Sequence, residues 1–432
     1  FRRVLFRSTG KEDPKNFNPT ALDTDQWVRT LKNAGFKQII LTAKHHDGFC
    51  LWPTETTGHS LKNSPWKNGS GDVVKELAAS CKKFNVGFGI YLSPWDMNAD
   101  SYGTPAYNDF FVKQLTELLT QYGKIDEVWF DGANGEGKNG LKQEYDFERW
   151  YKLIRKLQPE AVIAIMGPDV RWVGTETGKG RTQEWSVVPA DHMDQSSIAA
   201  ESQKDLTFKP SKDLRGEVLG DRDAILKATG LVWYPAETDV SIEDGWFYNE
   251  KHGVKTPEIL NDIYFTSVGM NGVLLLNIPP DKRGLIQDKE VKVLEEWTRK
   301  RMAIFGNNLL KGSKVTSNQF RSGKKLLDEN NQSQAKAGMK DRYYSVEFKM
   351  PKTQTFNVLQ LQENIAKGQR VEKFSAYYYT GNTWKKFGEG TTIGYKRLLR
   401  TDKVTADRIR IDIEQSRLEP NLSEVGLYFE NR

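Results

Sequence analysis

The sequence contains few cysteines and no long hydrophobic run, and each absence excludes a class of protein. Among its 432 residues only Cys50 and Cys81 are cysteines, and they fall in different helix–strand units, which excludes a disulfide framework. No window approaches the roughly 18 to 20 consecutive apolar residues that a membrane-spanning helix needs. We therefore expect no membrane span.

Histidine is also scarce, which bears on metal binding. The five histidines are His45, His46, His59, His192 and His252, and they form neither an HxH pair nor a cluster with carboxylates. Adjacent His45 and His46 leave a metal-dependent hydrolase open as one alternative. We nevertheless expect no metal and no other cofactor.

The charge is small overall but unevenly distributed. The net charge is +6; residues 301–432 hold 24 Lys and Arg against 14 Asp and Glu, whereas residues 1–300 hold 39 against 43. In the C-terminal part the cations alternate with apolar residues along predicted strands, which is typical of a solvated sheet face. We expect no nucleic-acid partner and two domains of different character.

A repeated helix-and-strand pattern extends to about residue 280. The first unit begins with the cap-type residues Asp23 and Thr24 and ends its helix at Gly35, and three more units follow at 71–93, 104–131 and 146–167. Short connections between alternating helices and strands indicate a parallel β/α architecture. No glycine-rich nucleotide fingerprint follows a strand, so we predict a (β/α)8-type TIM barrel rather than a doubly wound sheet.

The pattern changes after residue 306. Residues 307–325 predict a linker, and residues 326–432 contain short alternating strands with a turn at Gly381 and Asn382, which predicts an antiparallel β-sandwich. Residues 9–306 would form the barrel domain. Residues 1–8 differ from the orderly sequence after them, and we interpret them as a non-native leader on a truncated chain.

Alternation along two predicted strands assigns side chains to the inside of the barrel. In 86–93 the bulky even positions suit packing under helices, whereas Tyr91 and the other odd positions suit the interior. In 125–131 the same alternation places Glu127, Trp129 and Asp131 on one face. Trp129 and Asp131 should therefore both face the barrel axis.

Polar side chains gather where the predicted strands end, and the active sites of such barrels form at this edge. These ends contain Lys44 to Asp47, Tyr91 to Asp96, Asp131, Asp169, and Glu237 to Asp239. Glycoside hydrolysis needs two carboxylates in different environments, and they lie about 5 to 5.5 Å apart when configuration is retained. Asp131 is the best-placed nucleophile. The residue types alone leave Glu176, Glu184 and Glu237 open as its partner.

The same residues could also have purely structural roles. An aspartate at a strand end is more often a cap or turn residue than a catalyst, but its coincidence with Trp129 and the histidine pair favours function here. Tryptophans are usually core residues, whereas Trp95 and Trp172 fall at predicted loop tips, where they would stack on sugar rings. The residues predicted to bind substrate are His45, His46, Tyr91, Trp129, Trp95, Trp172, Glu237 and Asp239.

Several collinear motifs resemble one enzyme family. "LTAKHHDGFCLWPTETTGHS", "GIYLSPWD" and "VWFDGANG" are similar to the α-L-fucosidases of glycoside hydrolase family 29, and the similarity continues through "WYPAETDVSI", "GWFY" and "LLLNIPPDKRG" over about residues 9–300. "NSPWKNGSGDVV" and "RWVGTE" most resemble the branch that removes fucose linked α1,3 or α1,4 in Lewis-type structures.

The resemblance implies a retaining exo-α-L-fucosidase that needs no metal. Asp131 would be the nucleophile that forms a fucosyl-enzyme, Glu176 in "RWVGTE" the acid/base, and His45, His46, Tyr91 and Trp129 the fucose pocket. The substrate would be a fucosylated oligosaccharide or glycoconjugate, met in the periplasm or outside the cell. The oligomeric state is not predicted.

The sequence also departs from the family pattern. The family's first barrel strand should precede residue 9, and we expect it to be missing here. In addition, Glu243 and Asp244 stand where related sequences tend to have an Arg before "GWF". A carbohydrate-binding protein that has lost catalysis through N-terminal truncation is therefore an alternative. The C-terminal sandwich resembles galactose-binding-like modules, with a structural role as open as a sugar-binding one.

Overall fold

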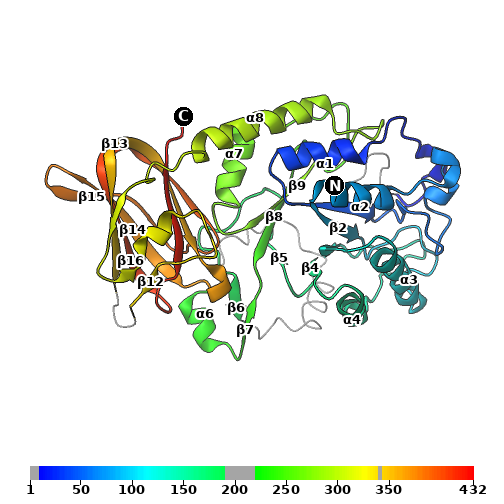
Figure 1. Ribbon diagram of the computed structural model, residues 1–432. Coiled ribbons are helices and arrows are strands. Elements are labelled where there is room, and N and C mark those ends of the chain that lie inside the picture. The colour runs from blue at the N-terminus through cyan, green and yellow to red at the C-terminus, as the bar shows by residue number, and fades with distance from the viewer. Residues whose placement is uncertain (1–8, 190–218, 339–342) are drawn as a thin grey trace.

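The computed structural model describes residues 9–189, 219–338 and 343–432. An α/β part is followed by an antiparallel β part, and the two lie side by side with α8 along one edge (Figure 1). The helices are α1 (Thr24–Asn33), α2 (Val73–Phe84), α3 (Ala106–Gln121), α4 (Phe147–Leu157), α6 (Arg222–Lys227), α7 (Pro257–Thr266) and α8 (Asp288–Phe305). The strands of the α/β part are β1 (Gln38–Lys44), β2 (Gly87–Leu92), β3 (Glu127–Phe130), β4 (Val162–Ile165), β5 (Arg171–Trp172), β6 (Val187–Pro189), β7 (Leu231–Trp233), β8 (Ala236–Ser241) and β9 (Val273–Asn277).

Side-chain caps fix where the helices of the α/β part begin. Asp23, Asp72 and Asp146 accept hydrogen bonds from backbone amides three residues onward, at 2.9 to 3.1 Å. The predicted start of the first helix is confirmed. Helix α3 begins at Ala106 with Pro105 as its N-cap, and the Thr104 hydroxyl donates to the Ser101 carbonyl.

Two parallel sheets form the centre of the α/β part. One has the strand order β1-β2-β3-β4, and the other has the order β5-β8-β9. A parallel bridge between Ala164 and Val170 links them. The parallel pairing and the helix–strand alternation agree with the predicted architecture, but the described residues contain no closed barrel, since neither sheet pairs β1 with β9.

The two faces of β2 and β3 differ as their alternation predicts. Phe88, Ile90, Val128 and Phe130 pack in the large apolar core under the helices. Tyr91 and Trp129 pack on the opposite side with Ile40 and Ala164. The predicted interior position of Tyr91 and Trp129 is thus confirmed, and both rings lie directly below the strand ends.

The C-terminal part is an antiparallel sheet that bends around its own core. Its strands are β10 (Lys314–Thr316), β11 (Phe320–Arg321), β12 (Lys336–Ala337), β13 (Tyr344–Glu363), β14 (Val371–Thr380), β15 (Thr383–Gly390), β16 (Arg397–Ser416) and β17 (Leu422–Tyr428). The main order is β10-β13-β16-β14-β15, with β17 on β13. The predicted turn between β14 and β15 is confirmed, with positive φ at Gly381 and Asn382. The segment 307–325, expected to be a linker, contributes β10 and β11 to this part.

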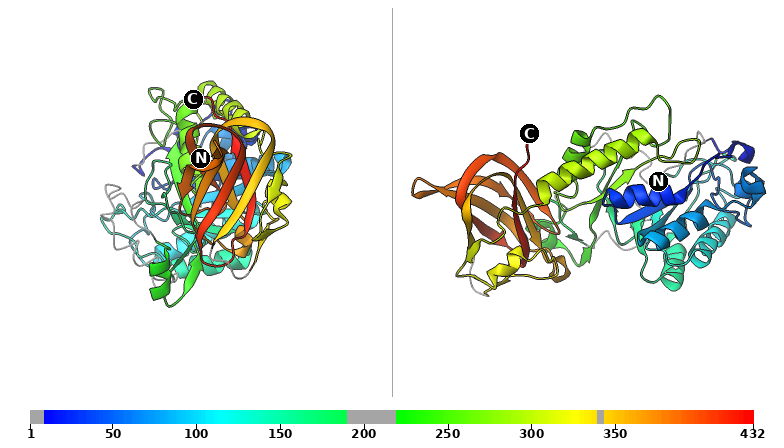
Figure 2. Two further views of the ribbon diagram at one scale, coloured as in Figure 1. Left: turned by 90° about the vertical axis from the view of Figure 1, so that its left-hand side faces the viewer. Right: turned by 45° about the horizontal axis from the view of Figure 1, so that its top comes forward.

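An apolar contact joins the two parts. Phe265 of α7 and Ile304 of α8 pack with Val358, Leu398 and Tyr428 of the β part. Figure 2 shows α7 and α8 beside the β part in a second orientation. No helix of the described ranges is long and apolar enough to cross a membrane.

Candidate active site

Asp131 directly follows β3, and its carboxylate is held by two hydrogen bonds. The Tyr91 hydroxyl donates to Oδ2 at 2.7 Å, and the backbone amide of Ala133 donates to Oδ1 at 2.8 Å. The Asp131 side chain is 15% exposed, so one edge still faces outward. A fixed, partly desolvated carboxylate at a strand end can act as a nucleophile.

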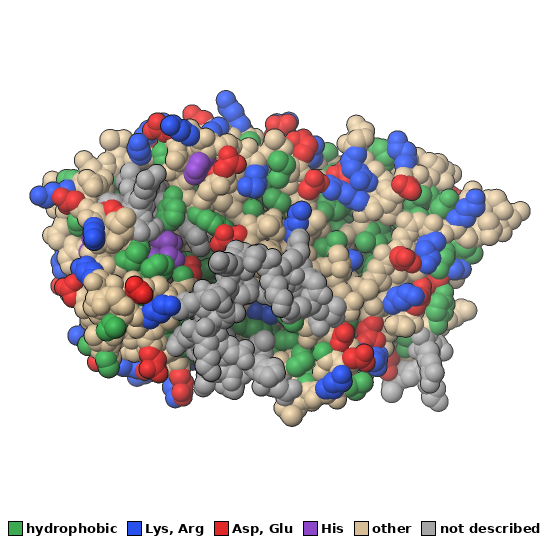
Figure 3. All heavy atoms as spheres, turned by 180° about the vertical axis from the view of Figure 1, so that it is seen from behind, with side chains coloured by type: hydrophobic (Ala, Val, Ile, Leu, Met, Phe, Trp, Pro, Cys, Tyr) green, Lys and Arg blue, Asp and Glu red, His purple; other side chains and the backbone are tan. Residues whose placement is uncertain are grey.

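The predicted histidine pair lies beside Asp131. His46 Nε2 is 3.9 Å from Asp131 Oδ2, while its Nδ1 is 2.7 Å from the Ser93 hydroxyl. The His45 ring is buried against His46, with centroids 3.9 Å apart, and meets Phe247 edge to face at 5.2 Å. Histidine, acidic and hydrophobic side chains gather in a hollow of the α/β part (Figure 3).

Trp129 packs against Tyr91, the residue that holds Asp131. Its ring stacks on Tyr91 with centroids 5.0 Å apart, and its indole N–H donates to Glu237 Oε1 at 2.8 Å. Glu237 is only 2% exposed. Burial and the nearby Glu127 carboxylate raise the pKa of Glu237 well above its ordinary value. This carboxyl group therefore lies buried at the N–H edge of the Trp129 ring.

Glu176 lies on the loop after β5, and its carboxylate is exposed. Trp246 donates its indole N–H to Glu176 Oε2 at 3.0 Å. The Trp246 backbone carbonyl in turn accepts a hydrogen bond from Asn277 at the end of β9. An exposed, oriented carboxyl group of this kind can exchange protons with a bound substrate.

The environments of Asp131 and Glu176 meet at one small cavity. Its volume is about 30 Å³, and it is lined by Ile40, Thr42, Tyr91, Trp129, Asp239, Trp246, Leu275 and Asn277. Tyr91 donates a hydrogen bond to Asp131 and Trp246 donates one to Glu176, so the cavity lies between partners of the two predicted catalytic carboxylates. The cavity has room for about one water molecule and is the floor of the site rather than a sugar pocket.

Trp172 and Trp95 occupy two sides of this region. Trp172, on β5, donates its indole N–H to Asp239 Oδ1 at 2.8 Å. The Trp95 ring lies 4.8 Å from the His46 ring, and its N–H donates to the Glu136 carbonyl at 3.1 Å. Both rings are partly exposed, as sugar stacking requires.

Other polar residues near the predicted strand ends have structural partners. Lys44 is fully buried and bonds to Asp96 and Gln114 at 3.0 and 2.9 Å. Asp169 forms an ion pair with Arg155. Glu184, an alternative acid/base by residue type, is buried between two arginines, Arg171 and Arg181. Glu184 is thereby separated from any exposed substrate position.

The sequence patterns did not single out Trp246 or Asn277 as site residues. Trp246 belongs to the quoted "GWFY" motif, which was the available signal, but its loop gave no indication of which carboxylate it would meet. Glu243, three residues earlier, is buried and anchors this loop through Gln287 at 2.8 Å and Lys289 at 3.4 Å. The position of Trp246 therefore depends on contacts between distant segments.

No group of three or more His, Cys, Asp and Glu side chains with metal-binding geometry occurs within residues 9–189, 219–338 and 343–432. The expected independence from metal stays a prediction.

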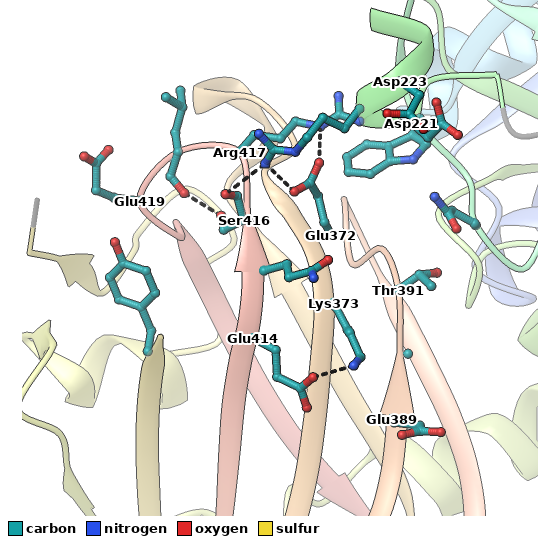
Figure 4. Close-up of a pocket in the computed structure, with 17 residues that line it drawn as sticks. Asp221, Asp223, Glu372, Lys373, Glu389, Thr391, Glu414, Ser416, Arg417 and Glu419 are labelled. Carbon is teal, nitrogen blue, oxygen red and sulfur yellow. Dashed lines mark hydrogen bonds and ion pairs between the residues drawn. The ribbon is translucent and has the colours of Figure 1, made fainter. Parts of the chain in front are cut away.

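A separate groove of about 1120 Å³ lies where the β part meets the α6 region (Figure 4). Arg222 and Arg417 both contact Glu372 across it, at 2.5 and 3.3 Å. The Arg417 guanidinium also covers the Trp185 ring at 3.5 Å. None of the predicted site residues lines this groove, so we interpret its charges as holding the two parts together.

Comparison with known proteins gives one consistent family. The family described as alpha-L-fucosidase matches residues 11–300. Alpha-L-fucosidase 1 of Arabidopsis thaliana is 41% identical over 441 residues, which cover 98% of this chain and 81% of that protein. A GH29 fucosidase of Ruminococcus gnavus, solved in complex with fucose, is 31% identical with a TM-score of 0.85, covering 99% of this chain and 90% of that one. The structure of SpGH29 is 35% identical with a TM-score of 0.87, covering 98% and 92%.

Proposed function

Since the chain belongs to the α-L-fucosidase family of glycoside hydrolases, we propose that it is a retaining exo-enzyme that releases terminal α1,3- or α1,4-linked L-fucose from Lewis-type glycans. The observation that carries the mechanism is that Tyr91, which donates a hydrogen bond to Asp131, and Trp246, which donates one to Glu176, line the same cavity. The seven parallel strands of the two linked sheets support a (β/α)8-type barrel as the scaffold.

Asp131 acts as the nucleophile in this proposal. It attacks the anomeric carbon while the bond from that carbon to the leaving oxygen breaks, and it forms a covalent fucosyl-enzyme. The hydrogen bonds from Tyr91 and Ala133 hold the carboxylate in one orientation, which reduces the entropic cost of reaching the attacking geometry.

Glu176 acts as the acid and then as the base. It gives its proton to the leaving oxygen in the first step and removes a proton from water in the second. Its exposure suits this role, because the proton must reach the aglycone side of the sugar. The hydrogen bond from Trp246 keeps the carboxyl group pointed toward the floor residues.

The remaining site residues enclose the sugar. His45 and His46 offer ring nitrogens to its hydroxyl groups, and Tyr91 and Trp129 present apolar surface to its ring. Trp95 and Trp172 form the rim, where the neighbouring sugar would lie, and Asp239 fixes Trp172. The R. gnavus relative in complex with fucose supports a monosaccharide pocket of this kind.

The linkage preference is tested by fucose release from a Lewis a trisaccharide, with 2'-fucosyllactose alongside at equal concentration. We expect release from the first and little from the second. Proton NMR of the early product distinguishes retention from inversion, because a retaining enzyme initially releases α-L-fucose. Release from neither glycan, or release of the β-anomer, would contradict the proposal.

We also propose a periplasmic or extracellular location, where fucosylated glycans of other cells are met. The support is the substrate class, because terminal fucose occurs on glycans that are displayed outside cells. Fractionation of producing cells tests it, and activity confined to the cytosol would contradict it.

A further inference from the structure

Glu237 has a buried position that the proposed chemistry does not use. It lies on β8, is 2% exposed, and accepts the Trp129 indole N–H at 2.8 Å. The Glu237 carboxyl group meets Trp129 at the N–H edge of the ring and does not line the small cavity above the strands. Its role must therefore pass through Trp129.

The surroundings of Glu237 contain other acids. Glu127 of β3 faces it and is itself buried, with one oxygen accepting from Gln38 Nε2 at 2.6 Å. Asp239, two residues along β8, is a second acid near Glu237. Burial raises the pKa of Glu127 to about 7, and burial with the Glu127 charge raises that of Glu237. Near neutral pH the pair therefore retains at least one proton.

A chain of direct contacts leads from this pair to the candidate nucleophile. Glu237 bonds to the Trp129 indole, the Trp129 ring stacks on Tyr91 with an interplanar angle of 22°, and the Tyr91 hydroxyl bonds to Asp131. Stacking leaves a ring free to slide or rotate, whereas a hydrogen bond from its edge fixes its plane. The hydrogen bond to Glu237 therefore fixes the orientation of the Trp129 ring.

We propose that Glu237 is a positioning residue, which sets the plane of Trp129 and, through Tyr91, the orientation of Asp131, without touching the sugar. This inference rests on the proposed function of Asp131. It replaces direct substrate binding, the role the sequence predicts for Glu237, with an indirect one. The required property is a hydrogen-bond acceptor, not a negative charge.

Two substitutions separate these properties. Glu237→Gln keeps an acceptor oxygen and removes the charge, so kcat should stay within about threefold of wild type at pH 6. Glu237→Leu removes the acceptor at similar volume, so kcat should fall at least tenfold while KM changes less than threefold. Glu363→Gln changes a fully buried glutamate of the β part and is the matched control, with kcat unchanged.

The pH profile and a double variant add independent readouts. A deprotonated Glu237 is still an acceptor, so the ratio of kcat between wild type and Glu237→Gln should stay within about threefold from pH 6 to pH 8. Adding Glu237→Leu to Trp129→Phe should cost no further activity, because the phenyl ring has no N–H to donate. Near-UV circular dichroism of Glu237→Leu should show an altered tryptophan signal.

The outcomes distinguish a positioning role from direct contact with the sugar. A Glu237→Leu protein with wild-type kcat, or a Glu237→Gln protein with strongly raised KM, would overturn the positioning role, the latter in favour of direct sugar contact. If Glu237→Leu does not fold, the Glu237→Gln kinetics and pH profile decide alone. Absence of fucosidase activity in wild type would instead refute the proposed function, and the near-UV signal would still report whether Glu237 holds Trp129.

Discussion

Trp246 donates its indole N–H to Glu176 at 3.0 Å across 70 residues of sequence. The same arrangement recurs nearby: Trp129 donates to Glu237 and Trp172 donates to Asp239, at 2.8 Å each. Each indole is held at its polar edge, which leaves its apolar face for other contacts. Rigid aromatic surfaces of this kind suit a sugar ring, which offers an apolar face and a polar rim.

Asp131→Asn should nearly abolish turnover, because the amide cannot form the glycosyl ester. We expect kcat to fall by about 10³-fold or more with little change in sugar affinity. Aryl-fucoside hydrolysis measures the first quantity, and calorimetric titration with fucose measures the second. A variant that retains a tenth of wild-type kcat would exclude Asp131 as nucleophile.

Glu176→Ala should separate good from poor leaving groups. General acid catalysis contributes typically about 10² to 10⁴-fold, so hydrolysis of a natural fucoside should fall by this order while an activated aryl fucoside is affected much less in the first step. Added azide should restore turnover with the aryl substrate. Glu160→Ala, at an exposed glutamate with 81% side-chain exposure, is the control. Equal losses on both substrates would argue against this role.

Trp246→Phe should lower kcat about tenfold or more, because a hydrogen bond to a charged group contributes about 1.5 to 3 kcal/mol. KM should change little if the indole acts on Glu176 rather than on the sugar. Trp233→Phe changes a tryptophan that is 41% exposed on β7 and should be neutral. Steady-state kinetics of both variants provide the test, and a neutral Trp246→Phe would remove Trp246 from the mechanism.

Stability should depend on Glu290, whose pKa burial and the nearby Glu243 raise to about 8. The folded chain keeps this proton to about pH 8, whereas the unfolded chain releases it near pH 4.5, so the free energy of unfolding falls as pH rises between these values. Glu290→Gln removes this dependence and retains the capping interaction with Gln287.

The advantage of Glu290→Gln over wild type should therefore grow with pH, by at most about 1.4 kcal/mol per pH unit. Urea unfolding at pH 5, 6.5 and 8 measures it. Glu295→Gln, at an exposed position of the same helix, should show no such trend. A constant difference between Glu290→Gln and wild type at all three pH values would contradict the expectation.

Arg400 should stabilise the attachment of the two parts. It contacts Glu430 at 2.7 Å and Asp262 at 2.5 Å, and its guanidinium lies 3.9 Å from the Phe265 ring. Arg400→Met removes two charge-assisted hydrogen bonds to Glu430, which keeps its contacts with Arg432 and Asn261, and should cost about 1 to 3 kcal/mol, measured by urea unfolding. Lys386→Met breaks an exposed pair with Glu389, which solvent screens, and should cost clearly less than Arg400→Met. Equal costs for the two variants would show that Arg400 has no special role.

The local patterns of the sequence determined much of the molecule. Helix caps such as Asp23 act within one turn, and alternation along β2 and β3 assigns Tyr91 and Trp129 to the interior, because a strand's side chains point in alternate directions whatever surrounds it. The strand ends also predicted a site at Asp131, since parallel strands present their carboxyl ends at one edge.

The tertiary structure decided which polar residues remain available for chemistry. Lys44 and Asp47 flank the two histidines in the sequence. In the fold, Lys44 donates hydrogen bonds to Asp96 and Gln114, and Asp47 accepts a hydrogen bond from a backbone amide. The acid/base candidate Glu176 is exposed and meets Trp246, 70 residues away, whereas Glu184 is buried between Arg171 and Arg181. Burial and hydrogen bonding of a side chain depend on long-range packing, so the sequence determined where a site could form, and only the fold determined which carboxyl groups it exposes.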